Sequence, residues 1–105
     1  MEFEEMMQKM DFLMYGSDLW RVKISHEEDG TPIIQIDLHR MSCKEVRKLL
    51  DNILARYRFN FTLDLIHGHN HGTAIKNMII NEIHNKRIDK KIISRNPGQT
   101  YIIVK

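Results

Sequence analysis

A chain of 105 residues with 42% hydrophobic side chains is long enough for one hydrophobic core and too short for two domains of ordinary size. No run approaches the ~18–20 consecutive apolar residues of a membrane span, and the first residues, MEFEEMMQKM, are acidic where a signal peptide is basic. The single cysteine, Cys43, has no partner within the chain for a disulfide. We therefore expect a cytoplasmic protein without a membrane partner.

Charge is distributed unevenly along the chain. Residues 1–30 contain three basic and eight acidic side chains, a net charge of −5, whereas residues 31–105 contain thirteen basic and six acidic side chains, a net charge of +7. A basic body can attract a polyanion such as nucleic acid, although many solvated surfaces are equally basic. We expect an N-terminal extension over residues 1–30, packed as a helix and a strand on a basic domain over residues 31–105.

The extension has two predicted elements. Apolar side chains at helical spacing predict an amphipathic helix over residues 3–14, which either covers an open face of the sheet or contacts a second subunit or a protein partner through its methionines. The segment LWRVKIS, residues 19–25, is typical of a strand, and the turn at residues 28–30 would lead it into the next one. Trp20, the only tryptophan, is expected in the core.

A strand and a helix follow. The segment IIQIDLH, residues 33–39, alternates apolar and polar side chains as a half-buried strand does. Ser42 and Glu45 form an S-x-x-E capping box, in which each side chain satisfies a backbone amide of the first helical turn. A helix is therefore expected over residues 42–58. Its buried stripe is predicted to be Val46, Leu49, Leu50, Ile53 and Leu54.

The second half of the chain repeats this alternation. FTLDLIH, residues 61–67, predicts a second strand, and glycines break it before a helix over residues 73–85. Residues 88–95 and 100–105 predict an antiparallel hairpin, in whose type II turn Pro97 fixes one central position and Gly98 takes the positive φ. Strands alternating with helices indicate an α/β layer structure.

The expected topology brings polar side chains together. The strand, helix and strand over residues 33–67 have about the length of a right-handed βαβ crossover, so the two strands should be parallel. Asp37, His39 and His67 then lie where parallel strands end, the edge at which open α/β sheets tend to bind ligands. His39 and His67 could face each other there.

The loop after His67 has the character of an anion site. It opens a helix, whose first amides lack internal partners and whose dipole end is positive. Gly68 and Gly72 let the backbone curl around a phosphate oxygen, Lys76 adds charge, and Thr73 either caps the helix or donates to phosphate. The predicted nucleic-acid and phosphate-binding residues are Arg40, Gly68, His69, Asn70, Gly72, Thr73 and Lys76.

Two stretches resemble a known family. IDLHRMSCKEVRKLL is similar to the L-D-L-H-G motif and following helix of the Smr domain, the small MutS-related module, and IHGHNHGTAIK is similar to its H-G-x-G-x-G-x-L-R loop. The resemblance covers residues 33–105 and implies a two-layer α/β sandwich with a βαβαββ core, similar to the C-terminal domain of translation initiation factor 3, and endonuclease activity on DNA or RNA. The matching positions are Asp37, His39, His67, Gly68 and Gly72, with Lys76 where the family often has arginine.

Two positions depart from the family pattern. Arg40 stands where the first motif usually has glycine, and its side chain could hold phosphate or block it. Asn70 replaces the middle glycine of the loop. Asparagine tolerates positive φ better than most residues, so Asn70 could keep the shape of the loop.

The leading hypothesis is a nucleic-acid endonuclease that uses acid–base catalysis by Asp37, His39 and His67. An imidazole with an ordinary pKa near ~6.5 can take a proton from the nucleophile while a second, protonated imidazole donates to the leaving oxygen, and Asp37 would orient a histidine. Loop amides and Lys76 would stabilise the transition-state charge. RNA is slightly preferred, because its 2′-hydroxyl is an internal nucleophile and no cofactor is required. Cleavage of DNA needs water, and a divalent metal would then assist.

Two alternatives stay open. The domain could be a non-catalytic module that binds RNA or DNA, with its loop altered at the two departing positions. His67, His69 and His71 could instead hold a transition metal, since imidazole suits zinc, copper or nickel. Gly68 and Gly72 interrupt the strand that would bring alternate side chains to one side, so metal ligands are not predicted.

Overall fold

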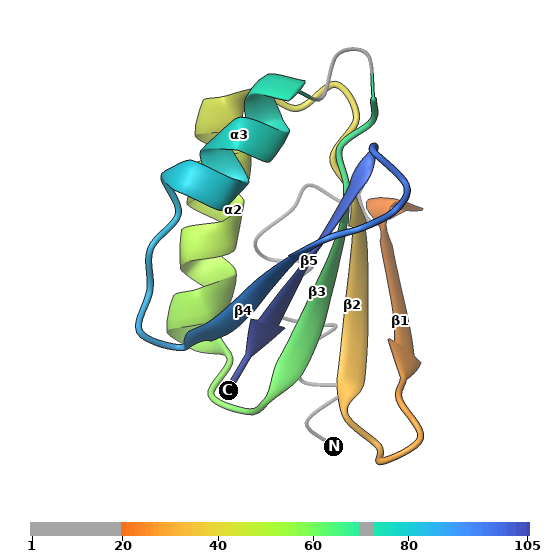
Figure 1. The fold of residues 1–105 in the computed structure, drawn as a ribbon. Helices are drawn as coiled ribbons and strands as arrows, with labels where there is room; N and C mark the ends of the chain where they lie inside the picture. Colours follow the sequence, from red (N-terminus) through yellow and green to blue (C-terminus); the bar gives the residue numbers. More distant parts are fainter. Residues whose placement is uncertain (1–19, 70–72) are drawn as a thin grey trace.

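The computed structural model describes residues 20–69 and 73–105. Within these ranges the chain forms one mixed sheet with two helices packed against one of its faces, which confirms the α/β class (Figure 1). The helix predicted over residues 3–14 lies outside the described residues. The elements are β1 (Val22–His26), β2 (Pro32–Asp37), α2 (Cys43–Arg56), β3 (Phe61–Ile66), α3 (Thr73–Asn81), β4 (Ile88–Ile93) and β5 (Gln99–Val104).

The strand order across the sheet is β1-β2-β3-β5-β4. β2 and β3 are parallel, with Ile34 opposite Leu63, and every other neighbouring pair is antiparallel. Parallel strands need a crossover, which α2 provides, so the predicted βαβ unit is confirmed. The predicted β4–β5 hairpin is confirmed as well.

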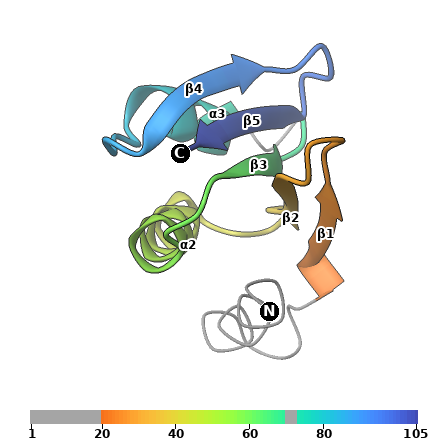
Figure 2. The ribbon, with the colours of Figure 1, turned by 90° about the horizontal axis from the view of Figure 1, so that it is seen from below.

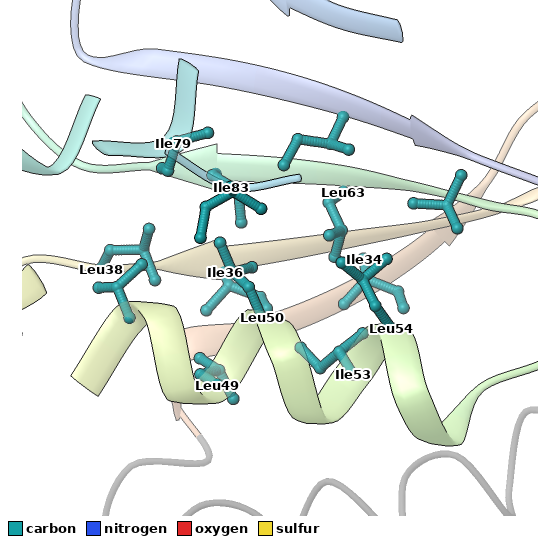
Figure 3. Close-up of a cluster of buried hydrophobic side chains, with 14 of the residues drawn as sticks. Ile34, Ile36, Leu38, Leu49, Leu50, Ile53, Leu54, Leu63, Ile79 and Ile83 are labelled. Atoms are coloured by element: carbon teal, nitrogen blue, oxygen red, sulfur yellow. The ribbon is translucent and has the colours of Figure 1, made fainter. Parts of the chain in front are cut away.

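The core lies between the sheet and the two helices, as Figure 3 shows. Alternate residues of β2 and β3, such as Ile36 and Leu65, point toward the helices and are fully buried. A fully buried leucine or isoleucine side chain contributes ~1.5–3 kcal/mol relative to an exposed one, so this face holds the layers together. The predicted helix stripe is confirmed, because its members are at most 5% exposed: Val46, Leu49, Leu50, Ile53 and Leu54.

Helix α2 begins with the predicted capping box. The hydroxyl oxygen of Ser42 accepts from the Glu45 amide at 3.1 Å, and the Glu45 carboxylate accepts from the Ser42 amide at 3.0 Å. Two of the amides that have no partner inside the helix are thereby satisfied. The cap also fixes the end of the turn between β2 and α2, and this turn carries His39.

Arg87 closes the other end of α2. Its guanidinium donates to the carbonyl oxygens of Leu54 (2.8 Å), Tyr57, Phe59 (2.9 Å) and Lys105 (3.1 Å). The Leu54 carbonyl therefore bonds to Arg87 and not to a further helical amide. Tyr57 leaves the helical conformation, with φ −98° and ψ 116°, so α2 ends at Arg56, before the predicted end at residue 58.

Helix α3 is shorter than predicted, ending at Asn81 and not at residue 85. The amide of Ile83 bonds back to the Met78 carbonyl at 3.1 Å, which turns the chain out of the helix. Lys91 on β4 donates through Nζ to the carbonyl oxygens of Ile80 (3.0 Å) and Ile83, replacing helical donors. Burial of this ammonium lowers the pKa of Lys91. The described helices are also too short or too polar to cross a membrane.

The turn of the β4–β5 hairpin differs from prediction. Gly98 does not take the positive φ of a type II turn; among the described glycines only Gly30 and Gly68 do. The hairpin turn is closed instead by the Gln99 amide on the Asn96 carbonyl, at 3.2 Å, and by the Gly98 amide on the Asn96 side chain. The reason for glycine at this position is contact with Gly68, as described below.

The prediction that Trp20 packs in the core is wrong. Its side chain is 61% exposed, because residues 20–21 form a short 3-10 turn that removes the indole from the alternation of β1. The Arg21 guanidinium carbon lies 4.8 Å from the centre of the indole ring. Strand β1 itself begins at Val22, after this turn.

Candidate active site

The candidate site lies where the two parallel strands end. The amide of Leu38 donates to the Ile66 carbonyl at 2.7 Å, which holds the ends of β2 and β3 together. Asp37 is the last residue of β2, and His39 and His67 lie just beyond the strands. Figure 2, which views the molecule from below, shows β2 and β3 as neighbours, with β1 on one side of them and β5 and β4 on the other. The predicted meeting of these residues at the carboxyl edge is confirmed.

Asp37 and His39 form a hydrogen-bonded pair. One carboxylate oxygen of Asp37, Oδ1, accepts from the backbone amide of His39 at 3.0 Å and lies 2.6 Å from His39 Nδ1. Because a carboxylate can only accept, Nδ1 carries a proton, and in the neutral form of the ring Nε2 is left as an acceptor. The His39 side chain is 53% exposed, so this acceptor belongs to a ring that a ligand can reach.

The carboxyl group of Asp37 stays ionised in this setting. Burial by itself would raise its pKa, but hydrogen bonds from the backbone and side chain of His39, with the positive charges of His39 and Arg21, outweigh burial and lower the pKa. A carboxylate at this position fixes the tautomer of His39 and the orientation of its ring. The pair therefore has the arrangement of a general base with its orienting group.

Gly68 lies directly against the ring of His39. The backbone of Gly68 has φ +88°, and a methyl group built on its α-carbon would lie 2.7 Å from His39 Nε2 and 3.0 Å from Cδ2. No other residue type fits there without displacing the imidazole. The acceptor nitrogen of His39 therefore adjoins the backbone that leads from β3 into the loop before α3.

His67 is placed differently from His39. It is only 2% exposed, its Nδ1 donates to the Gly68 carbonyl at 2.9 Å, and its Nε2 lies 2.9 Å from the Thr100 hydroxyl, which therefore donates. Burial lowers the pKa of His67, the charges of Lys76 and His39 lower it further, and the hydrogen bond to Gly68 opposes them only in part. The ring is held neutral with both nitrogens engaged, one of them with the Gly68 carbonyl.

The β4–β5 hairpin supplies partners that the sequence analysis missed. The amides of His67 and Gly68 both donate to the Gly98 carbonyl, at 2.9 and 3.0 Å. A side chain on Gly98 would lie 3.2 Å from the backbone of Gly68, which explains the glycine. Thr100 reaches His67 because β5 pairs with β3, placing it opposite Leu65. The local sequence carries no signal for a contact set by this long-range pairing.

Arg21 was also missed. Its Nη1 donates to the carbonyl oxygens of Asp37 (3.0 Å) and His39 (2.6 Å), which holds the turn after β2. This contact follows from the antiparallel pairing of β1 with β2, in which Val22 lies opposite Ile36. A single arginine in a predicted strand is not distinguishable in sequence from an ordinary surface residue.

The structure explains why the turn after β2 favours glycine in the motif that it resembles. Arg40 has φ +69°, in the left-handed region that is costly for residues with a side chain. The turn is closed by the Met41 amide on the Leu38 carbonyl at 3.1 Å. Arg40 is exposed beside His39, so the phosphate-binding role predicted for it stays a prediction.

The predicted phosphate loop is described only at its ends. Asn70 and Gly72, and with them His71, lie outside the described residues. His69 is exposed, and the hydroxyl of Thr73, the first residue of α3, donates to its carbonyl at 3.3 Å. Lys76 is half-buried, and its charge contributes to the lowered pKa of His67, so it belongs to the same neighbourhood. Binding of phosphate by these residues stays a prediction.

Within residues 20–69 and 73–105, no three histidine, cysteine, aspartate or glutamate side chains are grouped so as to hold a metal ion. The histidine triplet considered as a metal site includes His71, which is not among these residues. Of the other two members, His67 is buried with its nitrogens engaged as described above, and His69 is exposed.

Comparison with known proteins identifies no relative. No protein-family model matches the chain, and no match was found among curated proteins or among solved structures. The likeness to the small MutS-related family therefore remains a resemblance carried by two motifs. Function has to be argued from the chemistry of the site.

Proposed function

We propose that this protein is a nucleic-acid endonuclease of the type that its two motifs resemble, acting on RNA with His39 as the general base. The observation that supports this most is the Asp37–His39 pair, whose acceptor nitrogen Nε2 adjoins Gly68 at the start of the loop before α3. A base with an orienting carboxylate, next to a predicted anion-binding loop, is the combination that phosphodiester cleavage requires.

On RNA, the proposed reaction needs only groups of the protein and the substrate. His39 Nε2 takes the proton of a 2′-hydroxyl, whose oxygen attacks the neighbouring phosphorus. The bond from phosphorus to the 5′-oxygen breaks, leaving a 2′,3′-cyclic phosphate on one fragment and a 5′-hydroxyl on the other. Positive charge near the phosphate, from Lys76 and Arg40 in this proposal, stabilises the additional negative charge of the transition state.

The departing 5′-oxygen needs a proton. His67, first considered for this role, is buried and held neutral, and we propose that it positions Gly68 instead. The exposed His69 and the half-buried Lys76 are then the candidate donors among the described residues. If His69 is the donor, His69→Ala should slow cleavage and abolish the fall of the cleavage rate at higher pH that a general acid causes. If Lys76 only stabilises charge, Lys76→Met should slow cleavage at every pH.

The test uses the full chain with labelled single-stranded and duplex RNA and DNA, with and without a chelator. We expect RNA fragments that end in a 2′,3′-cyclic phosphate, insensitivity to chelator, and a loss of about 10²–10⁴-fold in His39→Ala. Asp37→Asn should lower the rate by a similar factor, because an amide can present a donor to Nδ1 and stabilise the wrong tautomer. His84→Ala, an exposed histidine on the segment after α3, is the control.

The alternative is a module that binds nucleic acid without cutting it, and one observation favours it. Arg40 places an exposed cation immediately after His39, where the resembled motif has glycine, and a phosphate held there could be kept from the base. Salt-sensitive binding, weakened in Arg40→Ala, together with no histidine-dependent cleavage, would replace the enzyme proposal with this one.

A further inference from the structure

Trp20 is exposed beside the candidate site. Its indole is 61% exposed, the largest exposed fraction among the large apolar side chains in the described part of the chain. The 3-10 turn that carries it precedes β1, and antiparallel pairing puts the start of β1 next to the end of β2 (Figure 1). A large aromatic surface left in water at the edge of a site is a typical feature of a ligand contact.

Arg21 connects this indole to the Asp37–His39 pair. The guanidinium carbon lies 4.8 Å from the centre of the indole ring, and Nη1 of the same group donates to the carbonyl oxygens of Asp37 and His39. One planar cation thus contacts the tryptophan on one side and the turn that carries His39 on the other. The place of the indole relative to the proposed base is set by direct contacts and not by a flexible linker.

The surroundings indicate the chemistry of the partner. The charged side chains that follow the indole in the described chain, Arg21 and Lys23, are cations, and so is Arg40 in the turn after β2; Lys23 and Arg40 are exposed. Asp18, which precedes the indole, lies outside the described residues. Aromatic rings combined with cations are the usual surface for single-stranded nucleic acid, in which each stacked base contributes ~1–3 kcal/mol. Bases inside a duplex already stack on their neighbours, so only an unpaired base can cover the indole.

We infer that Trp20, held by Arg21, is a stacking platform for one unpaired nucleobase beside the phosphate that His39 addresses, and that the protein therefore selects single-stranded substrate at this position. The inference rests on the proposed function for the identity of the neighbouring site. It adds the class of substrate and a residue that recognises it. Trp20 binds and positions the substrate in this view and takes no part in proton transfer.

The full chain reports on this contact directly, because Trp20 is its only tryptophan. His39→Ala protein, which leaves the substrate intact, is titrated with a single-stranded RNA, a DNA of the same sequence and the RNA duplex, and tryptophan emission is recorded beside the anisotropy of an end label. We expect saturable quenching by single strands and much weaker quenching by the duplex. In the same background Trp20→Ala should weaken single-strand binding by about 5- to 100-fold and Trp20→Phe by less, because a smaller ring still stacks.

Ile93→Ala is the matched control, since Ile93 is another exposed apolar side chain, 59% exposed, on the strand at the opposite edge of the sheet. It should bind like the parent protein. Binding that is unchanged in Trp20→Ala, or quenching that is equal for duplex and single strand, would overturn the inference. So would an emission change that depends on protein concentration without oligonucleotide, which would assign the indole to contact with a second copy.

Failure of this inference is separable from failure of the proposed function. Histidine-dependent cleavage by the wild-type chain, with no effect of Trp20→Ala on single-strand binding, would remove only the platform. Single-strand quenching that depends on Trp20, with no cleavage by the wild-type chain, would keep the platform and remove only the catalytic proposal.

Discussion

A methyl group on Gly68 would lie 2.7 Å from Nε2 of His39, so the backbone after one parallel strand and the imidazole after the other occupy adjoining space. The position of the proposed base therefore depends on a residue without a side chain. Because His39 is exposed, it can move away when that space is filled, and the ring would then leave the site while the fold survives.

Gly68→Ala should consequently reduce cleavage toward the level of His39→Ala. Because Gly68 has a positive φ, alanine at this position also lowers the free energy of unfolding by ~1–2 kcal/mol. Gly30→Ala is the control, because Gly30 has φ +89° but no atom within 4 Å of the added methyl group. Urea denaturation should show a comparable loss of stability in both variants, with cleavage lost only in Gly68→Ala. Equal cleavage by the two variants would contradict the proposed role of His39.

Arg40→Gly should stabilise the protein by about 1 kcal/mol. Arg40 holds a left-handed conformation, which glycine adopts without the steric cost that a side chain imposes. The measurement is the free energy of unfolding in urea. Lys48→Gly, at an exposed position inside α2, should instead destabilise by ~1 kcal/mol, because glycine is a poor helix former. A loss of stability in Arg40→Gly would show that the arginine side chain makes contacts worth more than the strain.

Stability should fall as the pH is lowered below about 6.5, and His67 should account for part of the fall. Burial, followed by the charges of Lys76 and His39, lowers the pKa of His67 in the folded protein, whereas the unfolded chain keeps the ordinary value. Between the ordinary pKa and the lowered one, the unfolded state binds a proton that the folded state does not, so acid favours unfolding by up to ~1.4 kcal/mol per pH unit. Above the ordinary pKa this contribution is absent.

His67→Asn tests this expectation, because the amide can still donate to the Gly68 carbonyl but does not titrate. The drop in unfolding free energy between pH 7.5 and pH 5.5 should be smaller in His67→Asn than in the wild-type chain. Thr100→Ser keeps a hydroxyl near Nε2 and should retain the full drop. An undiminished drop in His67→Asn would mean that other groups carry the pH dependence.

Arg87→Lys should destabilise the protein by ~1–3 kcal/mol. The guanidinium satisfies carbonyl oxygens at the end of α2 and beyond it, including those of Leu54, Phe59 and Lys105, and a single ammonium cannot reach all of them. Arg58→Lys, at an exposed position near the same helix end, should leave the free energy of unfolding within ~0.5 kcal/mol of the wild-type value. Similar behaviour of the two variants would show that Arg87 is not a structural cap.

The features that the sequence determined by itself are local ones. The capping box at Ser42, the buried stripe of α2, the alternation in β2 and β3 and the hairpin of β4 and β5 all depend on neighbours in the chain, and the structure has them. The parallel pairing of β2 and β3 followed from the length of the connection between them. The meeting of Asp37, His39 and Gly68 at one edge of the sheet followed from that pairing.

Only the tertiary structure decided which histidine side chain is buried and which is exposed to solvent. His67 is buried because β5 places Thr100 against it and the hairpin turn places Gly98 beside Gly68, and these contacts depend on strand register. Trp20 lies in a segment whose sequence is typical of a core strand, yet the 3-10 turn and Arg21 hold its side chain at the surface. Periodicity specifies which face of an element is apolar, whereas the partner of a side chain across the sheet is set by residues far away in the chain.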